Sequence, residues 1–199
     1  IGADCLIEGG QTMNPSTEDM LKAIERVNAE NIFILPNNKN IIMAAQQARD
    51  LTEDKNIIVI PSRTVPQGIT ALVNFMPDLG PEENTRTMTE EMGNVRTAQI
   101  TYAVRTTNID GIDIEEGDIM ALGDHGILAV GKSVDGVALE AMKEMLDDES
   151  ELVTIYYGAD VSEHEAKVLE EQAQEQYPDK EIELQYGGQP IYYYLISAE

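Results

Sequence analysis

Short apolar runs alternate with helical patterns through the first half of the chain, and this alternation constrains the fold more than any other feature. It is typical of βαβ units, in which parallel strands are joined through helices. The carboxyl ends of such strands meet at one edge of the sheet, where ligands bind. We expect strands at about 3–8, 32–35 and 56–60, and helices at about 17–28, 41–50 and 66–75. The loops that follow the three strands are therefore expected to converge.

Each of these loops carries polar side chains at the start of a helix. The first loop offers backbone N–H groups, hydroxyls and amides, which suit an anion or a carboxylate. The second and third loops each add a positive charge, and two such charges at one edge of a chain of net charge −24 favour a binding surface. Alternatively, the side chains only cap helices and satisfy loop backbone. The candidate ligand- or partner-binding residues are Gln11, Thr12, Asn14, Ser16, Thr17, Asn37, Asn38, Lys39, Ser62, Arg63 and Thr64.

The pattern changes after a proline- and glycine-rich stretch at 77–81 and a helix at about 82–92. We therefore expect two α/β subdomains, residues 1–92 with a largely parallel sheet flanked by helices, and residues 93–199 with a mixed sheet and acidic helices. The second should contain strands at 97–106, 118–122, 126–130, 151–157, 181–186 and 191–196, and helices at 137–146 and 162–177. The strands 118–122 and 126–130 are expected to form a hairpin. A Ser-x-x-Glu capping box at Ser162 and Glu165 marks the start of the last helix.

The charge balance excludes several classes of partner. There are 37 acidic residues against 13 basic ones, so the surface repels nucleic-acid backbones and anionic lipid headgroups. It would attract a basic protein, although the acids could also serve solubility alone. No apolar stretch approaches the roughly 20 residues that cross a bilayer, so no membrane insertion is expected. The single cysteine, Cys5, permits no internal disulfide and fits a reducing, cytoplasmic setting.

The sequence predicts no catalytic residue, no metal site and no cofactor within this chain. The two histidines, His125 and His164, stand beside no evident nucleophile and form no metal-binding spacing. No P-loop, G-x-G-x-x-G or G-x-S-x-G motif is present. The chain starts at Ile1 rather than at Met, so we expect that a preceding part of the natural protein is absent.

Several stretches resemble one family when they are taken in order along the whole chain. They are EGGQTMNPSTEDML, ILPNNKNIIMAAQQA, PSRTVPQGITAL, AVRTT with GIDIEEGD, and YGGQPIYYYLISAE. Together they resemble the C-terminal domain of the bacterial fatty acid kinase A subunit, the YloV or DAK2-domain family. The resemblance implies that ATP and magnesium bind a kinase domain elsewhere in the full-length protein. It implies that this chain is not itself an enzyme and docks a fatty-acid-binding DegV-family protein, whose acyl carboxylate that kinase domain phosphorylates.

A fainter resemblance links the chain to the DegV family itself, and it implies a DegV-like fold of two interlocked subdomains. Residues 12–16 are similar to the T-S-Q-P-S loop that helps DegV proteins hold a fatty acid carboxylate. Residues 37–41 correspond to the S-S-x-L-S-G-T loop, but asparagines, a lysine and an isoleucine replace its serines and glycine. We interpret the lipid site as lost or repurposed. The alternatives are a retained module that binds a fatty acid or anion, and an enzyme that transfers phosphoryl groups through Lys39 or Arg63.

Overall fold

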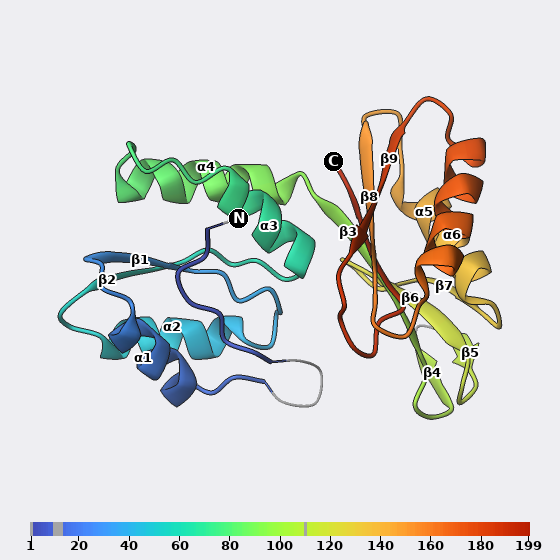
Figure 1. Cartoon of the computed structure of the whole chain (residues 1–199). Coiled ribbons are helices and arrows are strands. Elements are labelled where there is room, and N and C mark those ends of the chain that lie inside the picture. Colours follow the sequence, from blue (N-terminus) through green and yellow to red (C-terminus); the bar gives the residue numbers. More distant parts are fainter. Residues whose placement is uncertain (1, 10–13, 110) are drawn as a thin grey trace. The chain divides into compact units, whose positions relative to one another are not determined.

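The computed structural model describes residues 2–9, 14–109 and 111–199, and the chain divides into two compact units, Ile1–Val95 and Arg96–Glu199 (Figure 1). Each unit has its own hydrophobic core, so each is described by itself.

The first unit is a small parallel sheet with helices on both faces. Strands β1 (Asn31–Ile34) and β2 (Asn56–Val59) pair in parallel, with Ile32 opposite Ile57. These two isoleucines pack with buried residues of α1 (Thr17–Arg26) and α2 (Ile42–Leu51). The next residues along each strand, Phe33 and Ile58, pack with α3 (Val65–Val73) and α4 (Pro81–Gly93). The strands are continuous apolar runs because both of their faces are covered.

The predicted strand at 3–8 is wrong. This segment forms no strand, so the parallel sheet of the described residues has two strands rather than three. The reason lies in its side chains, since Leu6 is 80% exposed, and only Cys5 and Ile7 are partly buried. Ile7 packs against the core of α1 and α2. The segment thus contributes one apolar side chain to that core and takes no part in a strand ladder.

Side chains form hydrogen bonds with backbone groups at both ends of α1. At its start, the Ser16 hydroxyl accepts a hydrogen bond from the Asp19 N–H, and the Asp19 carboxylate accepts one from the Ser16 N–H. At its end, the Lys55 ammonium donates to the carbonyls of Ile24 (2.9 Å) and Val27 (2.7 Å). A cation at a helix C-terminus also complements the helix dipole. The start of β2 is thereby tied to the end of α1.

The second unit contains a six-stranded mixed sheet with the order β7-β6-β3-β10-β8-β9. Neighbouring strands are antiparallel except β8 and β9, which are parallel. Helices α5 and α6 supply buried residues to one core together with the sheet, which confirms the predicted mixed sheet with helices. The elements are β3 (Arg96–Tyr102), β6 (Ile119–Gly123), β7 (Ile127–Gly131), α5 (Val134–Met145), β8 (Leu152–Tyr157), α6 (Glu163–Gln176), β9 (Glu181–Tyr186) and β10 (Tyr194–Ala198).

Two strand predictions in this unit differ from the structure. The strand expected at 97–106 ends at Tyr102, and a hairpin that was not predicted follows, made of β4 (Thr107–Ile109) and β5 (Ile112–Ile114). A backbone hydrogen bond between residues 103 and 117 closes the base of this hairpin. The strand expected at 191–196 starts only at Tyr194, because Pro190, Ile191 and Tyr192 form a tight turn.

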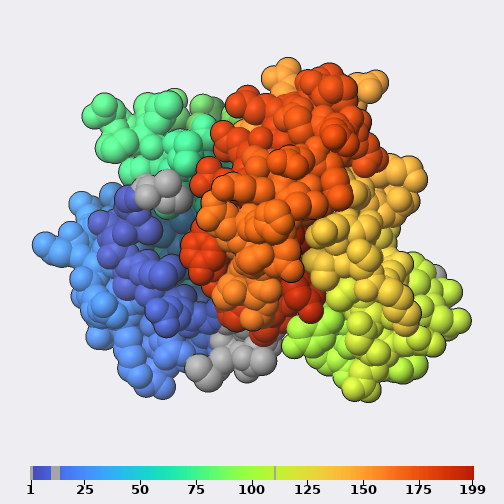
Figure 2. Space-filling view, turned by 45° about the vertical axis from the view of Figure 1, so that its right-hand side comes forward, coloured from blue at the N-terminus to red at the C-terminus, as the bar shows by residue number. Residues whose placement is uncertain are grey.

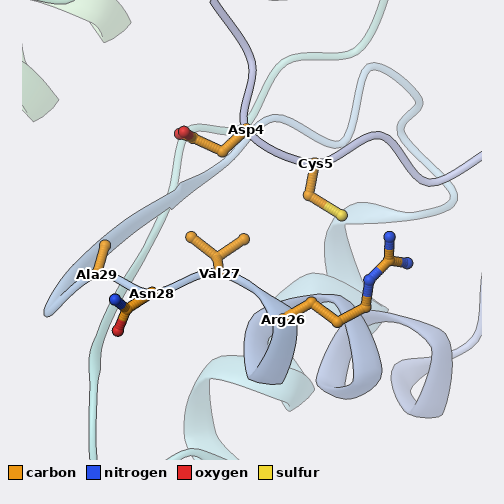
Figure 3. A pocket seen from close by; sticks show the side chains of 6 residues that line it. All are labelled: Asp4, Cys5, Arg26, Val27, Asn28 and Ala29. Carbon is orange, nitrogen blue, oxygen red and sulfur yellow. The ribbon is translucent and has the colours of Figure 1, made fainter.

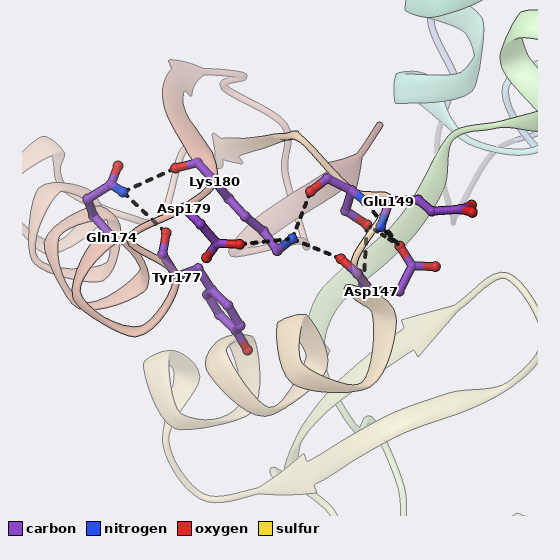
Figure 4. A network of polar contacts seen from close by, with 7 residues as sticks. Asp147, Glu149, Gln174, Tyr177, Asp179 and Lys180 are labelled. Carbon is purple, nitrogen blue, oxygen red and sulfur yellow. Dashed lines mark hydrogen bonds and ion pairs between the residues drawn. The ribbon is translucent and has the colours of Figure 1, made fainter.

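A polar network fixes the loop between α5 and β8 (Figure 4). The Lys180 ammonium, whose side chain is 9% exposed, donates to the carbonyls of Asp147 and Ser150, both at 2.8 Å. The Asp147 carboxylate forms an ion pair with Arg96 and accepts a hydrogen bond from the Ser150 hydroxyl. The hydrogen bond from Arg96 is the main reason that the pKa of Asp147 falls to about 2. The loop is thus tied both to β3 and to the turn before β9.

Candidate functional site

The loops after β1 and β2 meet at the carboxyl edge of the parallel sheet, where a ligand site was predicted. The Asn37 backbone N–H donates to the Ser62 hydroxyl at 3.0 Å. The same hydroxyl donates back to the Asn37 side-chain oxygen at 2.7 Å. Ser62 is fully buried and Asn37 is partly buried. The structure therefore brings together two of the predicted residues, from loops 25 positions apart in the sequence.

Asn37 adopts a left-handed backbone conformation with φ of 56°, which asparagine tolerates better than most residues do. Its side chain lies against α3 at Gly68. A Cβ atom added to Gly68 would stand only 1.9 Å from the Asn37 Oδ1. The amide group thus occupies the space that any larger residue on α3 would need. Gly68 belongs to this site although nothing in the sequence singled it out, because a helical glycine alone does not show what faces it.

Four other candidates form hydrogen bonds within the first unit. Ser16 and Thr64 cap α1 and α3, as the capping alternative predicts. Two hydrogen bonds from Ser16 lower the pKa of Asp19 below its ordinary value. The Asn38 side chain accepts from the Asn40 N–H at 2.9 Å, and the Thr17 hydroxyl donates to Gln47 of α2 at 3.0 Å.

Four predicted residues are exposed to solvent, namely Asn14, Lys39, Arg63 and the helix cap Ser16. Gln11 and Thr12 lie outside the described residues. A role in ligand binding stays a prediction for the whole set. What the geometry adds is a division between side chains engaged within the fold, such as Asn37 and Ser62, and the two exposed cations.

Two hollows formed by described residues lie elsewhere. A hollow of about 350 Å³ is lined by residues of the N-terminal segment and of the end of α1, with Cys5 and Arg26 both on its wall (Figure 3). A second, of about 230 Å³, lies beside β7 and the start of α5. Neither is lined by Asn37 or Ser62. Among the described residues, no group of three or more His, Cys, Asp or Glu side chains could hold a metal ion, and none of the helices is both long and apolar enough to cross a membrane.

The sequence profile of one family matches residues 1–199, and it describes the C-terminal region of proteins like the fatty acid kinase A subunit. The chain belongs to this family. Protein YloV of Bacillus subtilis is 47% identical over 199 residues, and an uncharacterized protein of Staphylococcus aureus (strain MRSA252) is 43% identical over the same length. Each alignment covers 100% of this chain but only 36% of the relative, so the chain spans about a third of their length. The family resemblance of the sequence is confirmed.

Solved structures of similar shape have low sequence identity, so they show the fold alone. The linoleic acid-loaded Fatty Acid Kinase B3 protein of Streptococcus pneumoniae matches with a TM-score of 0.64 and 16% identity, over 93% of this chain and 76% of that one. DegV, a fatty acid binding protein from Bacillus subtilis, matches with 0.61 and 16%, over 94% and 77%. The dihydroxyacetone kinase of C. freundii matches with 0.59 and 15%, over 94% and 41%. The predicted DegV-like α/β fold is confirmed.

Proposed function

We propose that this domain docks a fatty-acid-binding protein of the DegV family, so that a kinase domain elsewhere in the full-length protein can phosphorylate the acyl carboxylate. The domain itself is not catalytic, and ATP and magnesium bind in that kinase domain, in the cytoplasm. The observation that carries the proposal is the match of the whole chain to the C-terminal family of proteins like the fatty acid kinase A subunit. The match covers only 36% of the relative YloV, so the rest of that protein is long enough for a separate catalytic domain.

The geometry of the strand edge supports docking over lipid binding. A carboxylate held there would need free donors, yet the Ser62 hydroxyl is engaged with Asn37 on both its donor and acceptor sides. The Asn37 amide fills the space in front of Gly68. Asn37 and Ser62 thus serve the fold, whereas Lys39 and Arg63 at the same edge are exposed. A net charge of −24 also suits a basic surface on a protein partner, because opposite potentials speed encounter and fix orientation.

Isothermal titration of the 199-residue chain with the fatty-acid-binding protein of the same organism tests this proposal. Binding should be measurable at low salt and should weaken at about 0.3 M salt, where the Debye length is only about 5 Å. As a control, the fatty-acid-binding protein is reductively methylated, which keeps its lysine charges, and it should still bind. Absence of binding at low salt would contradict the docking role.

A second candidate is a DegV-like module that binds a fatty acid or another anion. The exposed cations Lys39 and Arg63 at the ends of neighbouring strands favour it, because a carboxylate could pair with either. Solved proteins of this fold have been described with linoleic and heptadecanoic acid. Native mass spectrometry of the gently purified chain distinguishes the two candidates. A retained lipid that is lost in the variant carrying Lys39→Ala and Arg63→Ala would support the module, whereas a clean unliganded mass would count against it.

A further inference from the structure

One end of the sheet in the second unit gathers the exposed apolar side chains of that unit. Strands β3, β8 and β9 all finish there, β10 begins there, and the hairpin β4–β5 lies between β3 and β6 at the same end. In Figure 2 the hairpin, in yellow-green, projects from the surface of its unit. Every exposed large apolar residue in the described part of this unit lies here, and we call the set the hairpin end: Tyr102, Val104, Ile109, Ile112 and Tyr186.

Four of the five members of the hairpin end, all but Val104, have an apolar or aromatic neighbour that the structure identifies. Ile109 and Ile112 face each other across the hairpin and are 40% and 39% exposed. The ring of Tyr102 lies 6.3 Å from that of Tyr193, and the ring of Tyr186 lies 5.1 Å from that of Tyr157. Tyrosine is enriched at protein interfaces, because a rigid amphipathic ring contributes contact area at little entropic cost. A gathered apolar patch of this kind marks an interaction surface.

The backbone at this end is strained and firmly held. Ile191 has φ of 73°, which is rare for a β-branched residue, and the Tyr192 N–H donates to the Pro190 carbonyl at 2.8 Å. This is a γ-turn of the rare left-handed kind. The Thr101 hydroxyl holds it by donating to the Ile191 carbonyl at 3.0 Å. Because residue 158 is glycine, the turn can lie close to the backbone there, since a Cβ would stand 2.1 Å from the Tyr192 carbonyl oxygen. Strain that the surrounding structure maintains clusters at functional sites.

The charge around the hairpin end is negative. Residues 102–118 contain five acidic residues and one basic residue, Arg105. Glu115 and Glu116 are exposed beside the hairpin. Lys132 reaches this segment and pairs with both Glu115 (2.8 Å) and Asp118 (2.5 Å), so its charge is already balanced. A partner that fits this surface therefore presents apolar side chains with lysine or arginine around them.

We propose that the hairpin end is the surface on which the protein partner docks, through an apolar patch with a basic rim on that partner. This inference rests on the proposed docking function and names the face that performs it. The held γ-turn and the paired tyrosines fix the patch before binding, so that little ordering entropy opposes association.

The test compares two variants of the hairpin end with two of the first unit, by titration with the fatty-acid-binding protein. Val104→Asp and Tyr186→Ser alter side chains that are 75% and 67% exposed, so the fold should tolerate them. Met43→Asp and Leu51→Asp are matched controls, since these residues are 69% and 65% exposed on α2. We expect the first pair to weaken binding about tenfold or more, as truncation of interface anchors does, and the controls to change it less than about twofold. Tyr186→Phe should retain binding, and circular dichroism confirms that each variant is folded.

The outcomes separate this inference from the function on which it rests. If the unaltered chain binds and the hairpin-end variants bind equally well, the choice of face is wrong and the docking function stands. Equal weakening by the controls would also overturn the choice of face, since the loss would then not depend on where the substitution lies. If the unaltered chain does not bind at low salt, the docking function fails and the inference falls with it.

Discussion

The contact between Asn37 and Gly68 predicts a strong energetic coupling between two residues 31 positions apart. Gly68 lies within α3, where alanine is normally more stable than glycine by about 1 kcal/mol. Here the added Cβ would meet the Asn37 Oδ1 at 1.9 Å, so the amide must move and release the buried Ser62 hydroxyl. Overpacking and the lost hydrogen bond together cost about 2–4 kcal/mol. We therefore expect Gly68→Ala to destabilise the protein by about 1–3 kcal/mol in net terms.

The same substitution should have the opposite sign once the Asn37 side chain is gone. In the Asn37→Gly background, nothing of residue 37 remains for the new Cβ to strike, and Gly68→Ala should stabilise the protein by about 1 kcal/mol. The double-mutant cycle should thus give a coupling of about 2–4 kcal/mol. Gly136→Ala in α5 is a matched control, because its Cβ would make only ordinary contacts with Ser133 at 3.5 Å. It should stabilise the protein by up to about 1 kcal/mol, and by the same amount in both backgrounds of residue 37.

Urea unfolding provides the measurement, with free energies from linear extrapolation. Far-UV circular dichroism follows both units, whereas tyrosine fluorescence follows the second alone, since all eight tyrosines lie after residue 95. If Gly68→Ala has the same effect in both backgrounds within about 0.5 kcal/mol, the packing argument is refuted. The Asn37 amide would then not be what the glycine accommodates.

Three further predictions concern the second unit. Lys180→Met should lower the free energy of unfolding in urea by about 1–3 kcal/mol, because two loop carbonyls lose their donor. Lys143→Met, which removes an exposed ion pair, should change it by less than about 0.5 kcal/mol. Equal effects would contradict the role of the network. The folded-state pKa of Asp147, about 2, lies below its ordinary 3.8, so the stabilisation it provides is complete above about pH 4 and is lost as the pH falls toward 2. Asp147→Asn should flatten the dependence of unfolding free energy on pH in that window, and an unchanged slope would show that the Arg96 pair does not drive it. Gly158→Ala should destabilise the second unit by about 1–3 kcal/mol, as followed by tyrosine fluorescence, because its Cβ would meet backbone rather than a movable side chain. A neutral effect would mean that the γ-turn can shift freely.

Local sequence signals predicted the helices and turns that nearby residues determine. They failed for strands, whose formation depends on pairing with distant residues. The helices α1 to α6 and the hairpin of β6 and β7 lie within a few residues of their predicted positions. The capping box at Ser162 and Glu165 is confirmed, because a cap is made by residues three apart. Residues 3–8 contain a short apolar run like that of a strand, yet no neighbour in the described part pairs with them. The hairpin β4–β5 has three residues on each strand, too few for an alternation to be noticed.

The candidate site followed the same division. The rule for parallel strands correctly placed Asn37 and Ser62 at one edge, since that follows from topology alone. It could not show that the two groups satisfy each other, because that depends on the left-handed backbone at Asn37. Nor could it identify the hairpin end as a surface, since the exposure of Tyr186 or Val104 depends on which strands neighbour them.

Both described non-glycine residues with a left-handed backbone occur beside a glycine from a distant part of the sequence. Asn37, at φ of 56°, packs on Gly68, and Ile191, at φ of 73°, adjoins the backbone that Gly158 admits. In each case the unfavourable conformation is held by a hydroxyl from a neighbouring segment, Ser62 in one and Thr101 in the other. A strained residue without such support would relax, so the glycine and the hydroxyl are the parts that maintain it. At Asn37 the result is an amide packed against α3, and at Ile191 it is a hydrogen-bonded turn beside an exposed apolar surface, which is where we expect the partner to bind.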